Sequence, residues 1–281
     1  MNKLLSANFA RLFRDKIFWI CMILMAIISG YVYMSAVSDM RTWNVIISPE
    51  DNLFGFSTFT AIFQSVFISI FVGTEYNDGT MRNKLAIGHS RAAIYLSNMI
   101  VCAAAGLLMC LVYMAVALAI GLLAIGGFEA APLTLAVFTA AAFLMSIAFS
   151  AIFTFVAMLI QNRSLSAVIN IVGIFAFLML SVYITSALSE PETASVYTYV
   201  AGGDGEGNDE MIEINQPNPH YVDGAMRDVY TFINDFLPTG QSISLTAMHT
   251  PYPQRLCVYS VIIISGVSAV GIVIFRRKNI R

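Results

Sequence analysis

The run most suggestive of chemistry is the Gly- and acid-rich stretch Gly203 to Glu210, whose composition suggests a calcium-binding loop. An EF-hand loop that began at Asp204 would need Gly at its sixth position and a bidentate Glu at its twelfth. The sequence has Asp209 and Asn215 at these positions. A solvated tip of a hairpin is therefore the favoured interpretation.

The other patterns typical of catalysis are missing from the sequence. His89, His220 and His249 are far apart and form no H-E-x-x-H pair, and there is no G-x-S-x-G motif. The chain also lacks G-x-x-x-x-G-K-[ST], so it has no P-loop for the phosphates of ATP. We predict no catalytic residue, no metal ligand and no cofactor bound by this chain.

A second polar stretch, from Phe71 to Asn98, lies between two strongly apolar runs. Asp78-Gly79-Thr80 predicts a turn followed by a helix N-cap at Thr80. A short helix over 81–86 would then be closed by Gly88, which tolerates a left-handed conformation. Ser90 is expected to cap the next helix. From the residues alone, this stretch is equally consistent with an ordinary basic loop at a membrane surface.

The composition indicates an integral membrane protein. Hydrophobic residues make up 58% of the 281 residues and charged residues 11%, whereas soluble domains carry about 25% charged residues. The four cysteines lie in or beside apolar runs, where small packing residues are expected; they are Cys21, Cys102, Cys110 and Cys257.

Residues 1–16 predict an amphipathic helix lying in the membrane interface. Leu5, Phe9, Leu12 and Phe13 recur at helical spacing, with basic residues on the other faces. Six spans of about the ~20 residues that a bilayer requires should follow. Their expected ranges are 17–36, 56–74, 92–128, 130–162, 165–188 and 256–275.

The distribution of basic residues predicts the orientation. Of the fifteen Lys and Arg residues, twelve fall at the end of the spans that carries both termini. We expect a multi-pass protein of the bacterial plasma membrane. Because Lys and Arg accumulate on the cytoplasmic side, both of its termini are expected in the cytoplasm. The loop 37–55 and residues 189–253 would then be extracellular.

Residues 189–253 predict a small α+β insertion before the last span. Two strands, 196–200 and 210–214, flank the Gly-rich turn and indicate a β-hairpin. Helical spacing from Met226 to Leu237 predicts a helix that starts near Asp223 and ends at Pro238. A second apolar helix is expected to follow.

The central parts of the predicted spans contain no Asp, Glu, Lys, Arg or His. Ionisable residues usually mark proton and ion pathways in membranes, so a proton-coupled carrier or an ion channel is disfavoured. If a pathway exists it should be apolar, although helix packing is the favoured role for its residues. The candidate lining residues are Phe59, Phe63, Gln64, Phe67, Asn170 and Phe175.

The polar stretch resembles the loop between the second and third spans of type-2 ABC exporter permeases. The resemblance is carried by Glu75-Tyr76, by the run from Asp78 to Leu85, by Gly88 with Ser90-Arg91, and by the run from Ile94 to Ser97. In that family this loop holds a coupling helix that sits in a groove of a separate ATPase. The resemblance assigns ATPase coupling to Glu75, Asp78, Gly79, Thr80, Met81, Arg82, Asn83, Lys84, Leu85 and Arg91.

The resulting fold prediction is an all-α integral membrane protein: an interfacial elbow helix (1–16), five spans with a coupling loop at 75–91 (17–188), an extracellular insertion (189–253), and a last span with a basic tail (254–281). The resemblance implies a homodimeric permease with two copies of a P-loop ATPase, which would bind ATP and Mg²⁺. We expect export of amphipathic peptides, in contact with membrane lipid and without nucleic acid. The alternatives are a drug or lipid-linked cargo, a non-transporting immunity or binding protein, and an intramembrane enzyme.

Overall fold

The six long apolar helices expected from the sequence are present in a computed structural model, which describes residues 1–200, 210–248 and 250–278. Each is long and apolar enough to cross a membrane. They are α2 (Lys16–Trp43), α3 (Phe56–Asn77), α5 (Arg91–Ala124), α6 (Pro132–Ile160), α7 (Arg163–Ser189) and α10 (Pro253–Arg277). The predicted fold class, a helical membrane protein with a small sheet in its insertion, is confirmed.

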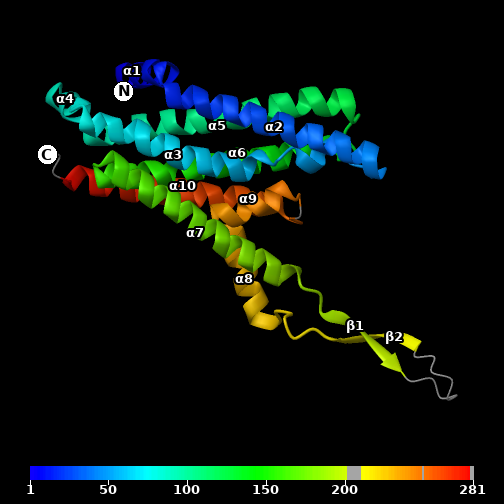
Figure 1. The fold of residues 1–281 in the computed structure, drawn as a ribbon. Helices are drawn as coiled ribbons and strands as arrows, with labels where there is room; N and C mark the ends of the chain where they lie inside the picture. Colours follow the sequence, from blue (N-terminus) through cyan, green and yellow to red (C-terminus); the bar gives the residue numbers. More distant parts are fainter. Residues whose placement is uncertain (201–209, 249, 279–281) are drawn as a thin grey trace.

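The two ends of the bundle differ in what they carry (Figure 1). Both chain termini and the short helix α4 (Thr80–Ala86) lie at one end, which we call the terminus end. The hairpin of β1 (Thr193–Val200) and β2 (Glu210–Pro217) projects beyond the other, which we call the hairpin end. Residues 203–209 of the Gly- and acid-rich stretch, for which a solvated hairpin tip was the favoured interpretation, lie outside the described residues, as do His249 and Arg281.

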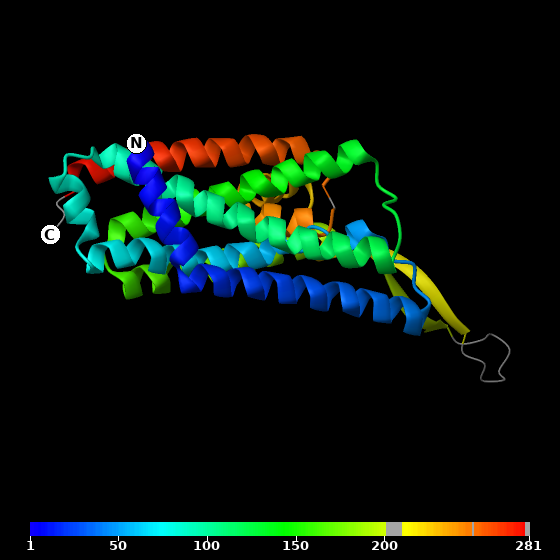
Figure 2. The ribbon, with the colours of Figure 1, turned by 90° about the horizontal axis from the view of Figure 1, so that it is seen from above.

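Helix α1 (Asn2–Arg14) lies crosswise over the bundle at the terminus end (Figure 2). Its buried residues are Leu4, Asn8 and Leu12. The buried face therefore differs from the predicted apolar face, which consisted of Leu5, Phe9, Leu12 and Phe13. Phe13 is 52% exposed because it lies off the buried face. The helix stops at Asp15, whose carboxylate accepts hydrogen bonds from the backbone N–H groups of Ile17 (2.8 Å) and Phe18 (3.2 Å) and so caps α2.

Helix α3 is the central helix of the bundle, in contact with α2, α4, α5, α6, α7 and α9 (Pro238–Thr246). Phe67, on α3, is fully buried and contacts the rings of Phe18 (6.0 Å between centroids) and Phe71 (5.2 Å). Since lipid tails are as apolar as these side chains, close packing and interhelical hydrogen bonds must hold the helices together.

Two predicted boundaries were wrong. Helix α2 continues to Trp43, beyond the predicted end at residue 36, and includes Asp39 and Arg41 in its last turns. It stops at Asn44, in the left-handed conformation (φ 53°). Helix α4 starts at Thr80 itself, and its N-cap is Gly79, whose φ of 68° reverses the chain without a side-chain cap.

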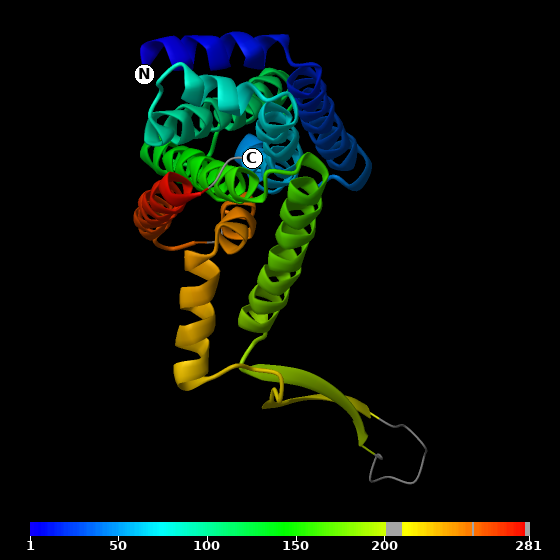
Figure 3. The same ribbon diagram turned by 90° about the vertical axis from the view of Figure 1, so that its left-hand side faces the viewer.

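The insertion consists of the hairpin and two helices. The strands pair antiparallel from Thr193 with Pro217 to Val200 with Glu210. Helix α8 (Gly224–Phe236) runs beside α7, and both lean away from the other helices (Figure 3). The chain then turns at Leu237, and α9 enters the bundle with Gln241 fully buried. Gly240 permits this turn, since a Cβ there would lie 2.1 Å from the carbonyl oxygen of Asn234.

A buried carboxylate fastens two loops at the hairpin end. Glu50 lies in the 3-10 helix η1 (Pro49–Asn52) and is 6% exposed. Its Oε1 accepts hydrogen bonds from the backbone N–H groups of Glu129 (2.9 Å) and Ala130 (2.6 Å), in the turn between α5 and α6. Tyr33 of α2 donates to the carbonyl of Pro49 (2.6 Å). The chain before α3 is thereby fixed to α2 and to the α5–α6 turn.

We expect Glu50→Ala to destabilise the protein, because it leaves two backbone donors without an acceptor, at a cost of about 1–3 kcal/mol. Thermal unfolding in detergent would measure the loss. Glu129→Ala is the matched control, since it removes an exposed carboxylate and keeps the backbone donor. Equal unfolding temperatures of the two variants would contradict the assigned role of Glu50.

Candidate functional site

The polar loop between α3 and α5 folds as a short helix held at both ends. Gly79 turns the chain out of α3, and Gly88 (φ 94°) turns it back after α4. The N–H of His89 then donates to the carbonyl of Lys84 (3.2 Å). Ser90 caps α5 as predicted, with its hydroxyl accepting from the N–H of Ala93 (3.3 Å). The position of α4 is therefore set by two helices that span the bundle.

Glu75, near the end of α3, is the centre of the site. Its carboxylate is fully buried, and Oε1 forms ion pairs with Arg11 of α1 and Lys84 of α4. A buried carboxylate requires such partners, because its hydration has been lost. The pair with Arg11 joins the end of α3 to α1.

Two asparagines complete a closed ring around this carboxylate. The Nδ2 of Asn98, on α5, donates to Glu75 Oε2 (2.9 Å), and its Oδ1 accepts from Asn8 Nδ2 of α1 (2.9 Å). Asn8 Oδ1 in turn accepts from Lys84 Nζ (2.9 Å). Polar contacts thus join α3, α4, α1 and α5 through Glu75, Lys84, Asn8 and Asn98, respectively. We call these four residues, together with Arg11, the Glu75 cluster.

The Glu75 cluster carries one carboxylate and two cations. Burial lowers the pKa of Lys84, whereas the adjacent Glu75 carboxylate acts in the opposite direction and favours the charged amine. Arg11 lies over the ring of Phe71, 3.8 Å from its centroid, a contact that stabilises a guanidinium. Its Nε and Nη2 are buried and find no hydrogen-bond partner within the described residues. Only one carboxylate therefore holds both cations.

The residues of α4 divide into a buried and an exposed face. Met81 is fully buried, and Lys84 and Leu85 are half-buried. Arg82, Asn83 and Ala86 are exposed, as is Asp78 before the helix, and Ile87 after it is 77% exposed. The exposed face of α4 and its C-terminal end therefore present one cation, Arg82, and one apolar side chain, Ile87.

Arg91 connects the same loop to the last helix. It lies at the first turn of α5, and its guanidinium donates to the carbonyls of Phe275 (3.2 Å) and Lys278, at the C-terminal end of α10. The Phe275 carbonyl also accepts a hydrogen bond from the N–H of Lys278 (3.4 Å), the C-cap residue of α10. The chain after α4 is thereby tied to α10 as well as to α5.

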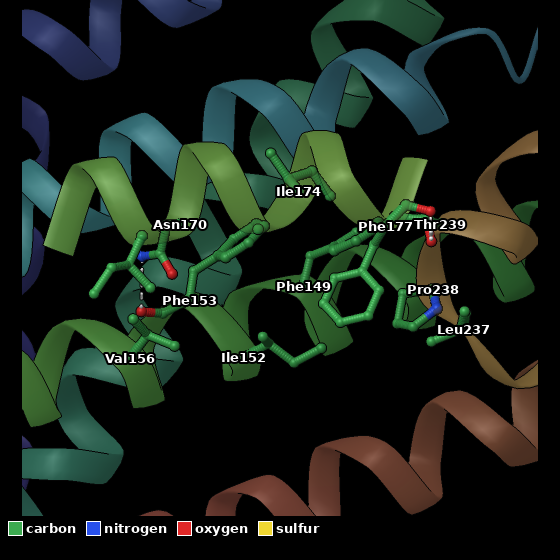
Figure 4. A pocket seen from close by; sticks show the side chains of 12 residues that line it. Phe149, Ile152, Phe153, Val156, Asn170, Ile174, Phe177, Leu237, Pro238 and Thr239 are labelled. Atoms are coloured by element: carbon green, nitrogen blue, oxygen red, sulfur yellow. Dashed lines mark hydrogen bonds between the residues drawn. The ribbon is translucent and has the colours of Figure 1, made fainter. Parts of the chain in front are cut away.

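The candidate pathway residues do not form one surface. Gln64 is fully buried and bonds to Ser146 (2.7 Å) and Ser150 (2.8 Å) of α6. Gly106 makes room for it, since a Cβ there would lie 2.2 Å from Gln64 Nε2. Phe59 and Phe63 pack at the edge of the core beside buried Phe67, and Phe175 is 46% exposed on α7. Asn170 lines a separate pocket between α6, α7 and the start of α9 (Figure 4).

Four residues of the site were not predicted: Asn8, Arg11, Asn98 and Ile87. Asn8 carried a usable signal, because it lies at i+4 from Leu4 and i−4 from Leu12, within the buried stripe of α1. Asn98 lies in an uncharged apolar run, where its partner on another helix has no sequence signature. Ile87 could be recognised only once the end of α4 was known.

A family model described as "ABC-2 family transporter protein" matches residues 4–177 of the chain, more than half of its length. The match includes α1, α4 and every residue of the Glu75 cluster. A search of curated proteins gave no match.

We expect Glu75→Gln to lower the stability of the protein strongly, because Arg11 and Lys84 would share a buried site without a counter-charge. Breaking a buried ion pair on one side costs roughly 3–5 kcal/mol. The shift in thermal unfolding would measure this. Adding Lys84→Met to this variant should recover part of the lost stability, because it removes one of the two cations. Asp78→Asn, at an exposed carboxylate in the same loop, is the control; a Glu75→Gln variant as stable as this control would show that the ion pairs do not stabilise the fold.

Proposed function

Because this chain belongs to the ABC-2 transporter family, we propose that it is the transmembrane permease subunit of an ATP-driven exporter whose ATP is hydrolysed by a separate subunit. Members of the family are membrane subunits, and the six apolar helices fit that role. In the proposed complex, ATP and Mg²⁺ are bound by a P-loop ATPase, which is present in two copies beside two copies of this chain.

The observation that carries the proposal is the division of α4 into two faces. Its exposed face, with Arg82, Asn83 and Ile87, offers a cation and an apolar side chain to a partner at the terminus end. Its other face is tied to the bundle through Lys84 in the Glu75 cluster. A helix with such faces is suited to receive a displacement from an ATPase and to transmit it.

The contacts of the loop indicate where a displacement would go. Through Glu75 and Asn98 it reaches α3 and α5, and through Arg11 and Asn8 it reaches α1. Arg91 extends the connection to α10. Coupling would therefore involve four helices, rather than only the two that flank α4.

Amphipathic peptides are the proposed cargo. The central parts of the spans carry no charged residue, so an ion or a strongly charged solute would find no partner there. Apolar residues such as Phe59 and Phe63 would favour an apolar cargo, and a drug or lipid-linked molecule of similar character is the alternative. The basic residues at the terminus end place both termini in the cytoplasm in this proposal.

The docking role of α4 predicts that a P-loop ATPase copurifies with the tagged protein from native membranes in mild detergent. Arg82→Glu combined with Ile87→Ser should abolish copurification of the ATPase, because it changes the exposed face of α4. The fold should be retained, since both side chains are exposed. Lys84 is unsuitable for this test, since its loss would disrupt the Glu75 cluster. Mass spectrometry of the purified material measures the outcome.

Arg14→Glu provides the control for charge reversal, because Arg14 is an exposed residue of α1 at the same end of the molecule. It should retain the ATPase. If wild-type protein yields no ATPase under conditions that preserve known complexes, the proposal fails in favour of a non-transporting binding or immunity protein. Retention of the ATPase by the α4 double variant would contradict docking at α4.

The proposed orientation is tested with single cysteines in a background that lacks Cys257, since the other three cysteines are buried. Ser195→Cys, in β1, should react with a membrane-impermeant maleimide in intact cells. Asn83→Cys, in α4, should react only after permeabilisation, because the terminus end would face the cytoplasm. The reverse pattern of labelling would invert the proposed topology.

A further inference from the structure

A pocket of about 300 Å³ lies between α6, α7 and the start of α9 (Figure 4). This volume is at the lower end of the ~300–1,000 Å³ typical of small-molecule sites. Its walls are formed mainly by Phe149 and Phe153 of α6, Gly173 and Phe177 of α7, and Pro238 at the turn into α9. No charged residue lines it, so a charged ligand would lose its hydration without compensation.

The pocket is open on one side and closed at its base. Ile169 and Phe177, on α7, are 44% and 51% exposed, whereas Phe149 and Phe153 are 2% and 4% exposed. Since α6 and α7 both have the character of membrane-spanning helices, the pocket lies in a part of the bundle suited to the bilayer. A ligand would therefore enter from the lipid phase.

One polar group in the lining has an unused hydrogen-bonding atom. Asn170 is 3% exposed, and its Nδ2 donates to Ser69 Oγ (2.7 Å) and to the carbonyl of Phe153 (3.4 Å). Its Oδ1 accepts no hydrogen bond from the described residues. Figure 4 shows the carboxamide projecting from α7 into the space toward α6.

The other polar side chain of the lining, Thr239, is fully engaged. Its hydroxyl donates to the carbonyl of Phe177 (3.2 Å) and contacts the hydroxyl of Ser181 (2.7 Å). Its oxygen therefore does not compete with Asn170 for a ligand. The two donations of Asn170 Nδ2 fix the carboxamide, so that Oδ1 is presented to the pocket as an acceptor and Nδ2 is not available as a donor.

We propose that this pocket is a binding site for a small, neutral aromatic molecule that carries one N–H or O–H donor, of the indole or phenol class, taken from the bilayer. The phenylalanine rings would pack against the ligand ring, and Asn170 Oδ1 would accept its donor. Inside a membrane such a donor finds no water, so an otherwise unpaired acceptor selects for it. The site does not depend on the ATPase or on peptide export.

Gly173 allows a test that leaves the fold intact. A Cβ at Gly173 meets no atom within 4 Å, so Gly173→Leu should enter the pocket without a clash at its first carbon. Gly266 of α10 is the matched control: it is also free of neighbours within 4 Å, but it lines a different groove, between α6 and α10. Thermal unfolding of each variant checks that both are folded.

The experiment is a ¹⁹F NMR titration of the full chain in phosphatidylcholine nanodiscs with 5-fluoroindole and with its N-methyl analogue, which lacks the donor. Empty nanodiscs measure simple partitioning. We expect saturable binding of 5-fluoroindole, about twofold to tenfold tighter than that of the analogue, as one neutral hydrogen bond would give. Gly173→Leu should abolish binding of both compounds, and Gly266→Leu should leave both unchanged.

Asn170→Leu should retain binding of the ring but remove the difference between the two compounds. Three results would overturn the proposal: partitioning equal to that of empty nanodiscs, equal affinity of the two compounds for the wild type, or an equal loss in Gly173→Leu and Gly266→Leu. The first would mean that only acyl chains occupy the pocket.

Discussion

The carboxylate of Glu75 is the interaction on which the terminus end of the molecule depends. It is fully buried and holds Arg11 and Lys84, the first from α1 and the second from α4. Burying the Glu75 carboxylate and most of the Lys84 side chain is costly, and the cost is recovered only if each partner stays in place. The geometry of α1 and α4 is thus fixed by a group that belongs to neither helix.

This arrangement determines how the loop behaves mechanically. A helix of seven residues is too short to be stable by itself, so α4 is held by Gly79, by the Ser90 cap and by Lys84. Asn8 and Asn98 close the ring with hydrogen bonds of 2.9 Å, so that α4 is tied to both α1 and α5. A family match covering α1 to the middle of α7 includes this whole assembly, which is consistent with a shared task for these elements.

The sequence was sufficient for features set by local chemistry. Apolar length predicted the six long helices, and Ser90 and Asp223 marked helix starts because capping depends on adjacent residues. The sequence was insufficient to predict contacts between residues that are distant along the chain. The bond between Asn98 and Glu75, and the burial of Glu50 against the α5–α6 turn, depend on tertiary packing. The extension of α2 to Trp43 was missed because polar residues at a helix end look the same as those in a loop.

The most direct test of coupling through the Glu75 cluster is hydrogen–deuterium exchange of the complex with the proposed ATPase, with and without a non-hydrolysable ATP analogue. The account predicts that nucleotide changes exchange in α4 and α1 together in the wild type. In a Glu75→Gln/Lys84→Met variant that still binds the ATPase, only α4 should respond, because its connection to α1 is lost. A response of α1 that persists in this variant would contradict the claim that the Glu75 cluster transmits the motion.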